Sequence, residues 1–255
     1  AKTEGGYILN GSKLWCTFAG AANVILVLAR TDKTEKSHKG LSLFMVEKPS
    51  SESEEFEFSQ DSGGRMTGKA IKTLGYRGMH SFEMSYTDFF VPEENLIGGD
   101  TGLNRGFYYT MKGFLNGRLQ TAARACGLMR SAYESTRAFA TDRSIFNKTL
   151  VDHPLTLRKI ADMAGLISAS RTYTLDVAKK MELGGGALDA NLVKLFACQS
   201  AEKVARDALQ LHGGMGYAQE TEVSRHFVDA KVLSIFEGTE ETLAVRVVGR
   251  EMTAN

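Results

Sequence analysis

Residues 154–186 read PLTLRKIADMAGLISASRTYTLDVAKKMELGGG and predict one long amphipathic helix. Pro154 suits the first helical turn, where its missing N–H would have no partner. Three glycines at 184–186 then end the helix, because glycine accepts the left-handed backbone of a helix C-terminus. Between these two signals, apolar residues recur at the three-to-four spacing of a single buried face: Ile160, Met163, Ala164, Ile167, Leu175, Ala178 and Met181.

Proline is scarce throughout the chain, which favours further long helices around this one. The 255 residues contain three prolines, at positions 49, 92 and 154. Residues 107–140 and 189–211 carry helix formers, and a shorter helix is expected to open near Thr239. For the 189–211 helix, the spacing of the large apolar residues predicts an inward face made of Leu192, Leu195, Phe196, Val204, Ala208 and Leu211.

The chain before Pro92 has the pattern of β-strands. Residues 22–29 are a short apolar run, residues 41–46 form a second, and Phe82, Met84 and Tyr86 alternate with polar residues. Residues 50–64 are acidic and rich in Ser and Gly, which indicates an exposed loop, with a short strand at 56–58. The sequence therefore predicts an α+β, multi-domain fold: a barrel-like or sandwich-like β domain at 1–98 and an antiparallel four-helix bundle at 99–255.

Composition excludes several classes of function. The 31 basic and 30 acidic residues leave a net charge of +1, without the basic excess that nucleic-acid binding requires. No apolar run approaches the roughly 20 residues of a membrane span. Three widely spaced cysteines argue against a disulfide scaffold, and the five histidines lack the spacing of a metal site. The Gly-rich phosphate-binding and nucleophile motifs are absent too.

Five short segments, in order along the chain, carry a more specific signal. They are KLWCT at 13–17, VPEEN at 91–95, DRSIF at 142–146, QLHGGMG at 210–216 and SIFEGT at 234–239. Together they resemble the acyl-CoA dehydrogenase family, in which the last segment is known as the EGT box. The resemblance covers nearly the whole chain. It implies the family's middle β domain followed by its C-terminal helical domain, with the N-terminal helical domain outside this chain.

The resemblance implies that Glu237 is the catalytic base, which removes the α-proton of an acyl-CoA thioester. The β-hydrogen would leave as hydride to flavin N5, giving a trans-2-enoyl-CoA. A carboxylate suits this task in an apolar pocket, because burial raises a carboxyl pKa toward working pH. Some relatives keep the base on the first long helix instead, but Gly117 occupies that position here. The residues expected to line the substrate site are Phe236, Gly238 and Arg118. From the sequence alone, a surface Glu near a helix N-terminus is the competing interpretation.

The implied cofactor is FAD, and two groups of residues would hold it. Trp15 and Thr17 match positions that contact the flavin ring, although a lone Trp in a strand is commonly a core residue. Arg143 and Phe146 match an Arg-x-x-Phe that reaches the FAD of a neighbouring subunit, where the guanidinium fork suits a pyrophosphate. The adenosine end would be held by Gln210, Gly213, Gly214, Thr239 and Glu241.

The sequence departs from the family pattern at a few of these positions. Asn147 replaces the glycine that ends the Arg-x-x-Phe-Gly motif, and Glu241 replaces a glutamine. None of the departures touches Glu237 or the pair Trp15 and Thr17, so we interpret the chain as a divergent branch of the family.

The resemblance also implies partners and a cellular setting. Electrons would pass to an electron-transferring flavoprotein in β-oxidation or related fatty acid metabolism, and the enzyme would be a homodimer or homotetramer. The expected location is the cytoplasm in a bacterium or the mitochondrial matrix in a eukaryote. Two alternatives stay open at this point: a flavin-dependent oxidase or monooxygenase on the same fold, and a non-catalytic binding or assembly subunit.

Overall fold

The structure is a computed structural model that describes residues 1–253. It divides into two compact units, Ala1–Gly113 and Phe114–Asn255. Strands come first and long helices follow, which confirms the predicted fold class. The domain boundary expected after residue 98 stays a prediction.

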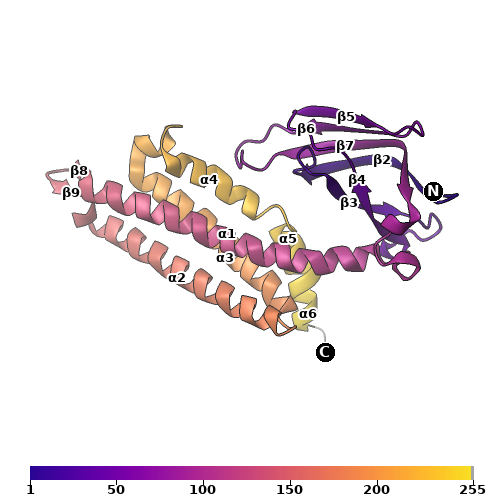
Figure 1. Ribbon diagram of the computed structural model, residues 1–255. Coiled ribbons are helices and arrows are strands. Elements are labelled where there is room, and N and C mark those ends of the chain that lie inside the picture. The colour runs from indigo at the N-terminus through magenta and orange to yellow at the C-terminus, as the bar shows by residue number, and fades with distance from the viewer. Residues whose placement is uncertain (254–255) are drawn as a thin grey trace. The chain divides into compact units, whose positions relative to one another are not determined.

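The first unit contains a five-stranded antiparallel sheet and a two-stranded one (Figure 1). The strand order in the larger sheet is β1-β2-β7-β6-β5. Its strands are β1 (Lys2–Thr3), β2 (Gly6–Thr17), β5 (Glu55–Ser59), β6 (Arg65–Ala70) and β7 (Ser81–Pro92). The smaller sheet pairs β3 (Val24–Arg30) with β4 (Leu41–Glu47). Strand β6 was not expected from the sequence, whereas the strand inside the acidic segment is confirmed as β5.

Large apolar side chains from both sheets form one core in this unit. Phe82, Met84 and Tyr86 are all buried, as their alternation in β7 predicts. From the smaller sheet, Phe44 is fully buried and packs against Tyr7, with the ring centroids 4.9 Å apart. The unit is therefore a sandwich-like β fold with a continuous aromatic and aliphatic interior.

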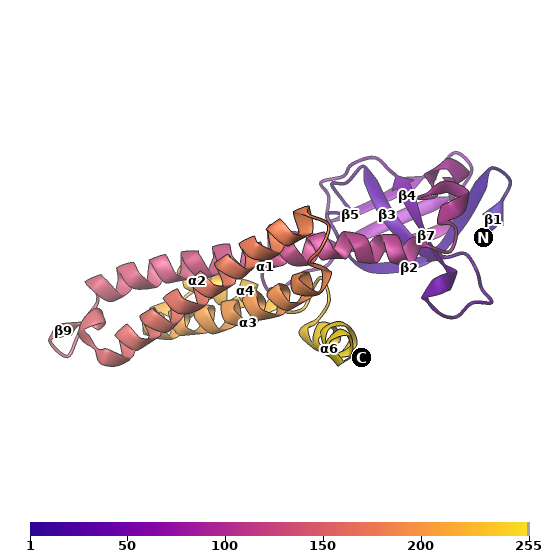
Figure 2. The same cartoon turned by 90° about the horizontal axis from the view of Figure 1, so that it is seen from below.

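The second unit is built mainly from long helices that lie alongside one another (Figures 1 and 2). They are α1 (Gly106–Asp142), which begins in the first unit, α2 (Pro154–Glu182), α3 (Ala187–His212) and α4 (Glu222–Leu233). Between α1 and α2 lies a hairpin of β8 (Ser144–Ile145) and β9 (Lys148–Thr149). After α4 come α5 (Glu240–Thr242), a π-helical stretch (Leu243–Val248) and α6 (Gly249–Thr253). Among residues 1–253, no helix is long and apolar enough to cross a membrane.

The buried faces of α2 and α3 differ from the predicted ones. In α2, Met163 is buried as expected, but Leu175 and Ala164 are exposed, and Ser170 and Val177 take the inward positions. The large apolar residues expected inside α3 are mostly half-buried or exposed, and only Val204 and Ala208 of the predicted set are buried. The actual inward residues of α3 are largely small: Ala190, Ala197, Ala201, Ala205 and Ala208.

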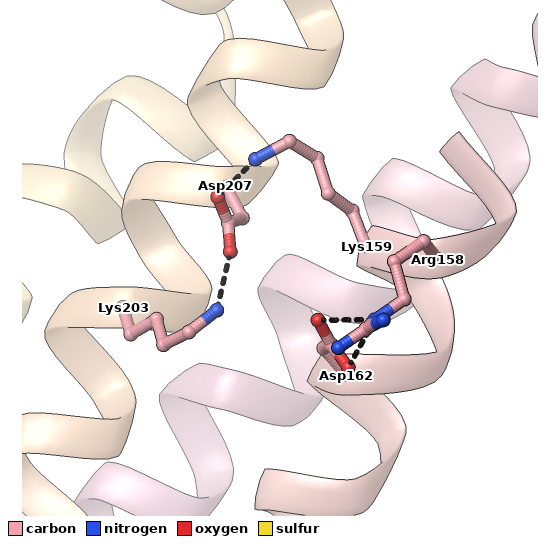
Figure 3. Close-up of polar contacts among 5 residues, drawn as sticks. All are labelled: Arg158, Lys159, Asp162, Lys203 and Asp207. Atoms are coloured by element: carbon pink, nitrogen blue, oxygen red, sulfur yellow. Dashed lines mark hydrogen bonds and ion pairs between the residues drawn. The ribbon is translucent and has the colours of Figure 1, made fainter. Parts of the chain in front are cut away.

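A buried carboxylate links α2 to α3 near the C-terminal end of α3 (Figure 3). Asp207 of α3 is paired on one oxygen with Lys159 of α2, and its Oδ2 accepts from Lys203 Nζ at 2.9 Å. Burial alone raises the pKa of Asp207, but the hydrogen bonds from the two lysines outweigh it and hold that pKa below its usual value. The neighbouring pair of Arg158 and Asp162 lies along α2 and is much more exposed.

Candidate functional site

Glu237 lies in the connection between α4 and α5, in a strained backbone conformation. Its φ is 57°, in the left-handed region that side chains with a Cβ rarely adopt, and the next residue, Gly238, has φ 98°. Strain of this kind is often stored at functional sites. The side chain is not that of a solvated surface glutamate. Its Oε2 atom is buried and has no hydrogen-bond partner among residues 1–253.

The carboxylate of Glu237 occupies space that a missing side chain leaves on α1. A Cβ atom at Gly117 would lie 2.6 Å from Glu237 Oε2, which is far too close for two unbonded atoms. Gly117 is the position at which some relatives are expected to carry their base. The absence of a side chain there makes room for the carboxylate of Glu237.

Two buried cations hold the backbone carbonyls of Glu237 and of the residue that follows it. Arg118 of α1 donates from Nε to the carbonyl oxygen of Glu237 at 3.1 Å. Lys194 of α3 donates from Nζ to the carbonyl oxygen of Gly238 at 2.8 Å. Asn191, also on α3, orients the arginine by accepting from its Nη1 at 2.7 Å. The two consecutive carbonyls of the left-handed turn are thus fixed from two different helices.

Burial disfavours the charged forms of both Arg118 and Lys194. Burial lowers the pKa of the Arg118 guanidinium, and the nearby Glu237 carboxylate partly opposes this effect. Burial also lowers the pKa of the Lys194 ammonium, while Cys198 and the carboxylate of Glu240 partly oppose it. Two of the guanidinium donors of Arg118 bond to protein groups, and the predicted contact of Arg118 with substrate stays a prediction.

The segment after Glu237 begins the next helix. Thr239 caps α5, and its hydroxyl oxygen accepts from the N–H of Thr242 at 3.3 Å. Glu241 is exposed in the first turn, where its own N–H and the Thr239 hydroxyl lower the pKa of its carboxyl group. Phe236 is half-buried. The substrate and adenosine contacts implied for these residues stay predictions.

Arg143 and Phe146 lie on the β8–β9 hairpin, at the other end of the helical unit from α5 and α6 (Figure 1). The ring of Phe146 is 88% exposed. The guanidinium of Arg143 makes no ion pair or hydrogen bond within residues 1–253. Phe146 and Asn147 form a two-residue turn with φ values of 49° and 60°. Asn tolerates this left-handed conformation, which explains how Asn147 can replace the family's glycine.

The predicted adenosine contacts at the end of α3 lie near this hairpin. His212 of α3 stacks on Phe139, close to the end of α1 from which the hairpin starts, with the ring centroids 4.4 Å apart. Gln210, Gly213 and Gly214 are exposed. A Cβ atom at Gly213 or Gly214 would meet nothing within 4 Å, so the backbone here faces open space. The helical unit therefore carries predicted site residues in two separate places: around Glu237 and α5, and at the β8–β9 hairpin with the end of α3.

Trp15 and Thr17 belong to the β unit, at an irregularity of β2. The pairing of β2 with β7 shifts between Lys13 and Cys16, and Trp15 lies in this bulge with φ 62°. Its side chain is 59% exposed, so the interpretation of Trp15 as a core residue is wrong. Thr17 is exposed as well. The flavin contacts implied for Trp15 and Thr17 stay predictions.

Sequence reasoning missed Asn191 and Lys194. Both lie on the buried face of α3, where large apolar residues had been expected. The sequence signal that could have identified them is the presence of two polar residues, a lysine and an asparagine, among the alanines of one helical face. Among residues 1–253, no group of three or more His, Cys, Asp or Glu side chains could hold a metal ion.

Comparison with known families matches both parts of the chain. The model described as "Acyl-CoA dehydrogenase, middle domain" matches residues 1–89, and "Acyl-CoA dehydrogenase, C-terminal domain" matches residues 104–253. (2S)-Methylsuccinyl-CoA dehydrogenase of Cereibacter sphaeroides is 38% identical over 248 residues, which cover 96% of this chain and 44% of that protein. A 2-methylacyl-CoA dehydrogenase of Solanum tuberosum mitochondria is 34% identical, covering 98% and 57% respectively. The chain spans about half the length of the curated relatives it matches.

Solved structures agree with these sequence matches. Butyryl-CoA dehydrogenase from Megasphaera elsdenii superposes with a TM-score of 0.87 and 32% identity, over 99% of this chain and 62% of that one. A structure described as "Electron transferring flavoprotein of Acidaminococcus fermentans: Towards a mechanism of flavin-based electron bifurcation" superposes with a TM-score of 0.88 and 29% identity. It covers all of this chain and 63% of the matched chain. The chain belongs to the acyl-CoA dehydrogenase family, of which it contains the middle and C-terminal domains.

Proposed function

We propose that this chain is the part of an FAD-dependent acyl-CoA dehydrogenase that carries the catalytic base, and that Glu237 is that base. The observation behind the proposal is the buried Oε2 atom of Glu237, which lies over Gly117 without a hydrogen-bond partner among residues 1–253. A carboxylate oxygen that is shielded from water and bonded to no protein donor can take a proton without first losing a partner. Most buried polar atoms in proteins are hydrogen-bonded, and Glu237 Oε2 is one of five side-chain exceptions among residues 1–253.

The proposed reaction begins at the carbon next to the thioester carbonyl. Glu237 takes the α-proton onto its carboxylate, and negative charge develops on the thioester oxygen. The backbone N–H of Glu237 donates to no protein acceptor among residues 1–253 and can therefore stabilise that oxygen. When bound, FAD supplies the acceptor for the β-hydrogen and its electron pair. The product is a trans-2-enoyl-CoA.

The exposed residues of the chain fit a flavin dinucleotide. Trp15 offers an aromatic face at the β2 bulge, next to the hydroxyl of Thr17. Arg143 offers an uncommitted guanidinium, which suits a pyrophosphate, and Phe146 offers a ring for stacking. Gly213 and Gly214 leave their backbone open to a ligand.

The predicted site residues around Glu237 and those at the β8–β9 hairpin lie far apart on the helical unit, which supports an oligomer. Arg118 and Arg143 are separated along α1 by roughly 37 Å, at 1.5 Å per helical residue. This exceeds the reach of one dinucleotide, so we propose that the hairpin serves the flavin of a neighbouring subunit in a homodimer or homotetramer. Electrons would then leave to an electron-transferring flavoprotein. The description of the Acidaminococcus fermentans structure names such a protein.

The test measures flavin reduction by acyl-CoA substrates. The purified protein is mixed anaerobically with butyryl-, isovaleryl- and methylsuccinyl-CoA, the acyl groups named in matched relatives. At least one should bleach the flavin absorbance and yield an enoyl-CoA. Glu237→Gln should lose this activity by about 10²–10⁴-fold while keeping the flavin. The matched control is Glu182→Gln, an exposed carboxylate on α2, which should behave like the wild type.

Other outcomes would favour the alternatives. Rapid oxygen consumption without an enoyl-CoA product would favour an oxidase or monooxygenase. A protein that binds no flavin would favour an assembly subunit. Full activity in Glu237→Gln would remove the base assignment.

A further inference from the structure

Lys194 is a buried cation without a carboxylate partner. Its relative exposure is 0%, and it is among the largest fully buried side chains of the protein. Its recorded hydrogen bond goes to the carbonyl oxygen of Gly238, at 2.8 Å. Within residues 1–253 it forms no ion pair. An ammonium group satisfied by a neutral carbonyl is expensive to bury. An apolar side chain of similar length would suit stability alone.

The carbonyl that Lys194 holds belongs to the strained turn of the site. Glu237 and Gly238 both have positive φ values, of 57° and 98°. For Glu237 this conformation costs about 1–2 kcal/mol, so the surrounding contacts must impose it. Arg118 fixes one of the two carbonyls and Lys194 fixes the other. Without Lys194 the Gly238 carbonyl would be free to turn, and the carboxylate beside it would move.

Lys194 also affects the charge around the proposed base. Arg118 faces it from α1, Glu237 and Glu240 face it from the segment after α4, and Cys198 lies on its own helix. Two cations therefore share this buried region with two carboxylates. A positive charge close to a carboxylate favours the ionised form, which is the form that can accept a proton.

We propose that Lys194 is a positioning residue for Glu237, which fixes the left-handed turn at Glu237 and Gly238 by donating a hydrogen bond to the Gly238 carbonyl. The proposal rests on the function proposed for Glu237. It concerns the ammonium group itself, so loss of that group should alter the turn and lower kcat.

The first test is kinetic and uses Lys194→Met, which keeps the length of the side chain without its charge or donors. We expect kcat to fall by roughly 10–100-fold, as displacement of a catalytic group does, with KM for acyl-CoA within about threefold. Lys194→Arg, which keeps the charge and the hydrogen-bond donors, should restore much of the lost kcat.

The matched control is Lys48→Met in the β unit. Lys48 is also a buried lysine whose Nζ donates to backbone carbonyls, those of Gly20 and Pro49. Its loss removes a buried cation that, within residues 1–253, makes no recorded contact with the Glu237 turn. The variant should leave kcat unchanged. An equal fall of kcat in Lys48→Met and Lys194→Met would overturn the proposal.

The second test does not depend on activity. Hydrogen–deuterium exchange is followed by mass spectrometry for the peptide covering residues 234–242. In Lys194→Met these amides should exchange faster than in the wild type, while those of the β unit should not change. If the wild type shows no dehydrogenase activity, faster exchange would still support the structural role, and only the proposed function would fail.

Two results would contradict the inference directly. One is a folded Lys194→Met protein with wild-type kcat and exchange. The other arises if Lys194→Met does not fold, in which case Lys194→Gln is measured in the same way. That variant lacks the ammonium group, and wild-type kcat and exchange in it would contradict the proposal.

Discussion

The two ends of α3 each bury a charged residue, and they satisfy the charge in opposite ways. Near the C-terminal end, each oxygen of Asp207 meets a lysine whose side chain still reaches water. Near the N-terminal end, Lys194 is completely buried and meets a single backbone carbonyl. The first arrangement neutralises a charge and ties two helices together. The second leaves an ammonium group without an ion pair among residues 1–253, beside a strained turn, which a requirement of the site explains better than stability does.

The largest effect on stability is expected at the Asp207 end. Asp207→Asn removes the charge that two lysines share and should lower the free energy of unfolding by about 2–3 kcal/mol. Urea unfolding followed by circular dichroism measures this, and the turnover of folded enzyme should stay within about twofold. The control is Asp162→Asn, which breaks the exposed pair with Arg158 (Figure 3) and should cost no more than about 0.5 kcal/mol. An equal loss of unfolding free energy in the two variants would show that the buried ion pairs of Asp207 stabilise the protein no more than the exposed pair does.

The next largest effect is expected at the Glu237 end and concerns catalysis. Gly117→Ala places a methyl group where Glu237 Oε2 lies, so the carboxylate must move and kcat should fall by about tenfold. Gly127→Ala lies on the same helix with nothing within 4 Å of the added carbon. It should leave kcat unchanged and stabilise the helix by about 0.5–1 kcal/mol. Identical kinetics in the two variants would mean that the carboxylate does not use this space during catalysis.

A smaller effect concerns the pH dependence of stability. The folded-state pKa of Asp207 lies below its unfolded value, because its two lysines favour the carboxylate. Its contribution is therefore complete above the unfolded pKa, near pH 4, and is lost as the pH falls through the folded value. The difference in unfolding free energy between wild type and Asp207→Asn should shrink between pH 6 and pH 3. A difference that stays constant over this range would show that the charge of Asp207 is not what stabilises the pair of helices.

The smallest effect on stability is expected at the hairpin. The ring of Phe146 is 88% exposed, so Phe146→Ala should change the free energy of unfolding by no more than about 0.5 kcal/mol. The flavin content per protein should nevertheless fall, if the ring stacks on a cofactor as proposed. Leu155→Ala is the control, since Leu155 is 80% exposed at the start of α2. Equal flavin content in both variants would argue against a cofactor role for Phe146.

Sequence patterns predicted the order of elements better than the faces they bury. Pro154 and the three glycines marked both ends of α2, because their backbone preferences act locally. Helix α4 was missed, since its 12 residues (222–233) are a short segment and bury only Val223, Ala230 and Leu233. The inward face of α3 was misjudged because large residues were assumed to point inward, whereas alanines allow its neighbours to pack closely.

The candidate site was predictable only as far as its motifs are local. Glu237 was predicted as the base from the six-residue segment 234–239 that contains it. Lys194 and Asn191 could not be, because their contacts join residues 44 or more positions apart in the chain. Trp15 illustrates the opposite case, in which a local motif identified an exposed residue that composition alone would place in the core.

The space over Gly117 has a consequence for how such enzymes diverge. A side chain at 117 and the carboxylate of Glu237 would compete for the same volume, although they come from chain segments 120 residues apart. An acidic side chain at 117 would therefore have to displace the carboxylate of Glu237. This volume has room for one acidic group, supplied either by the helix or by the loop, and not for two.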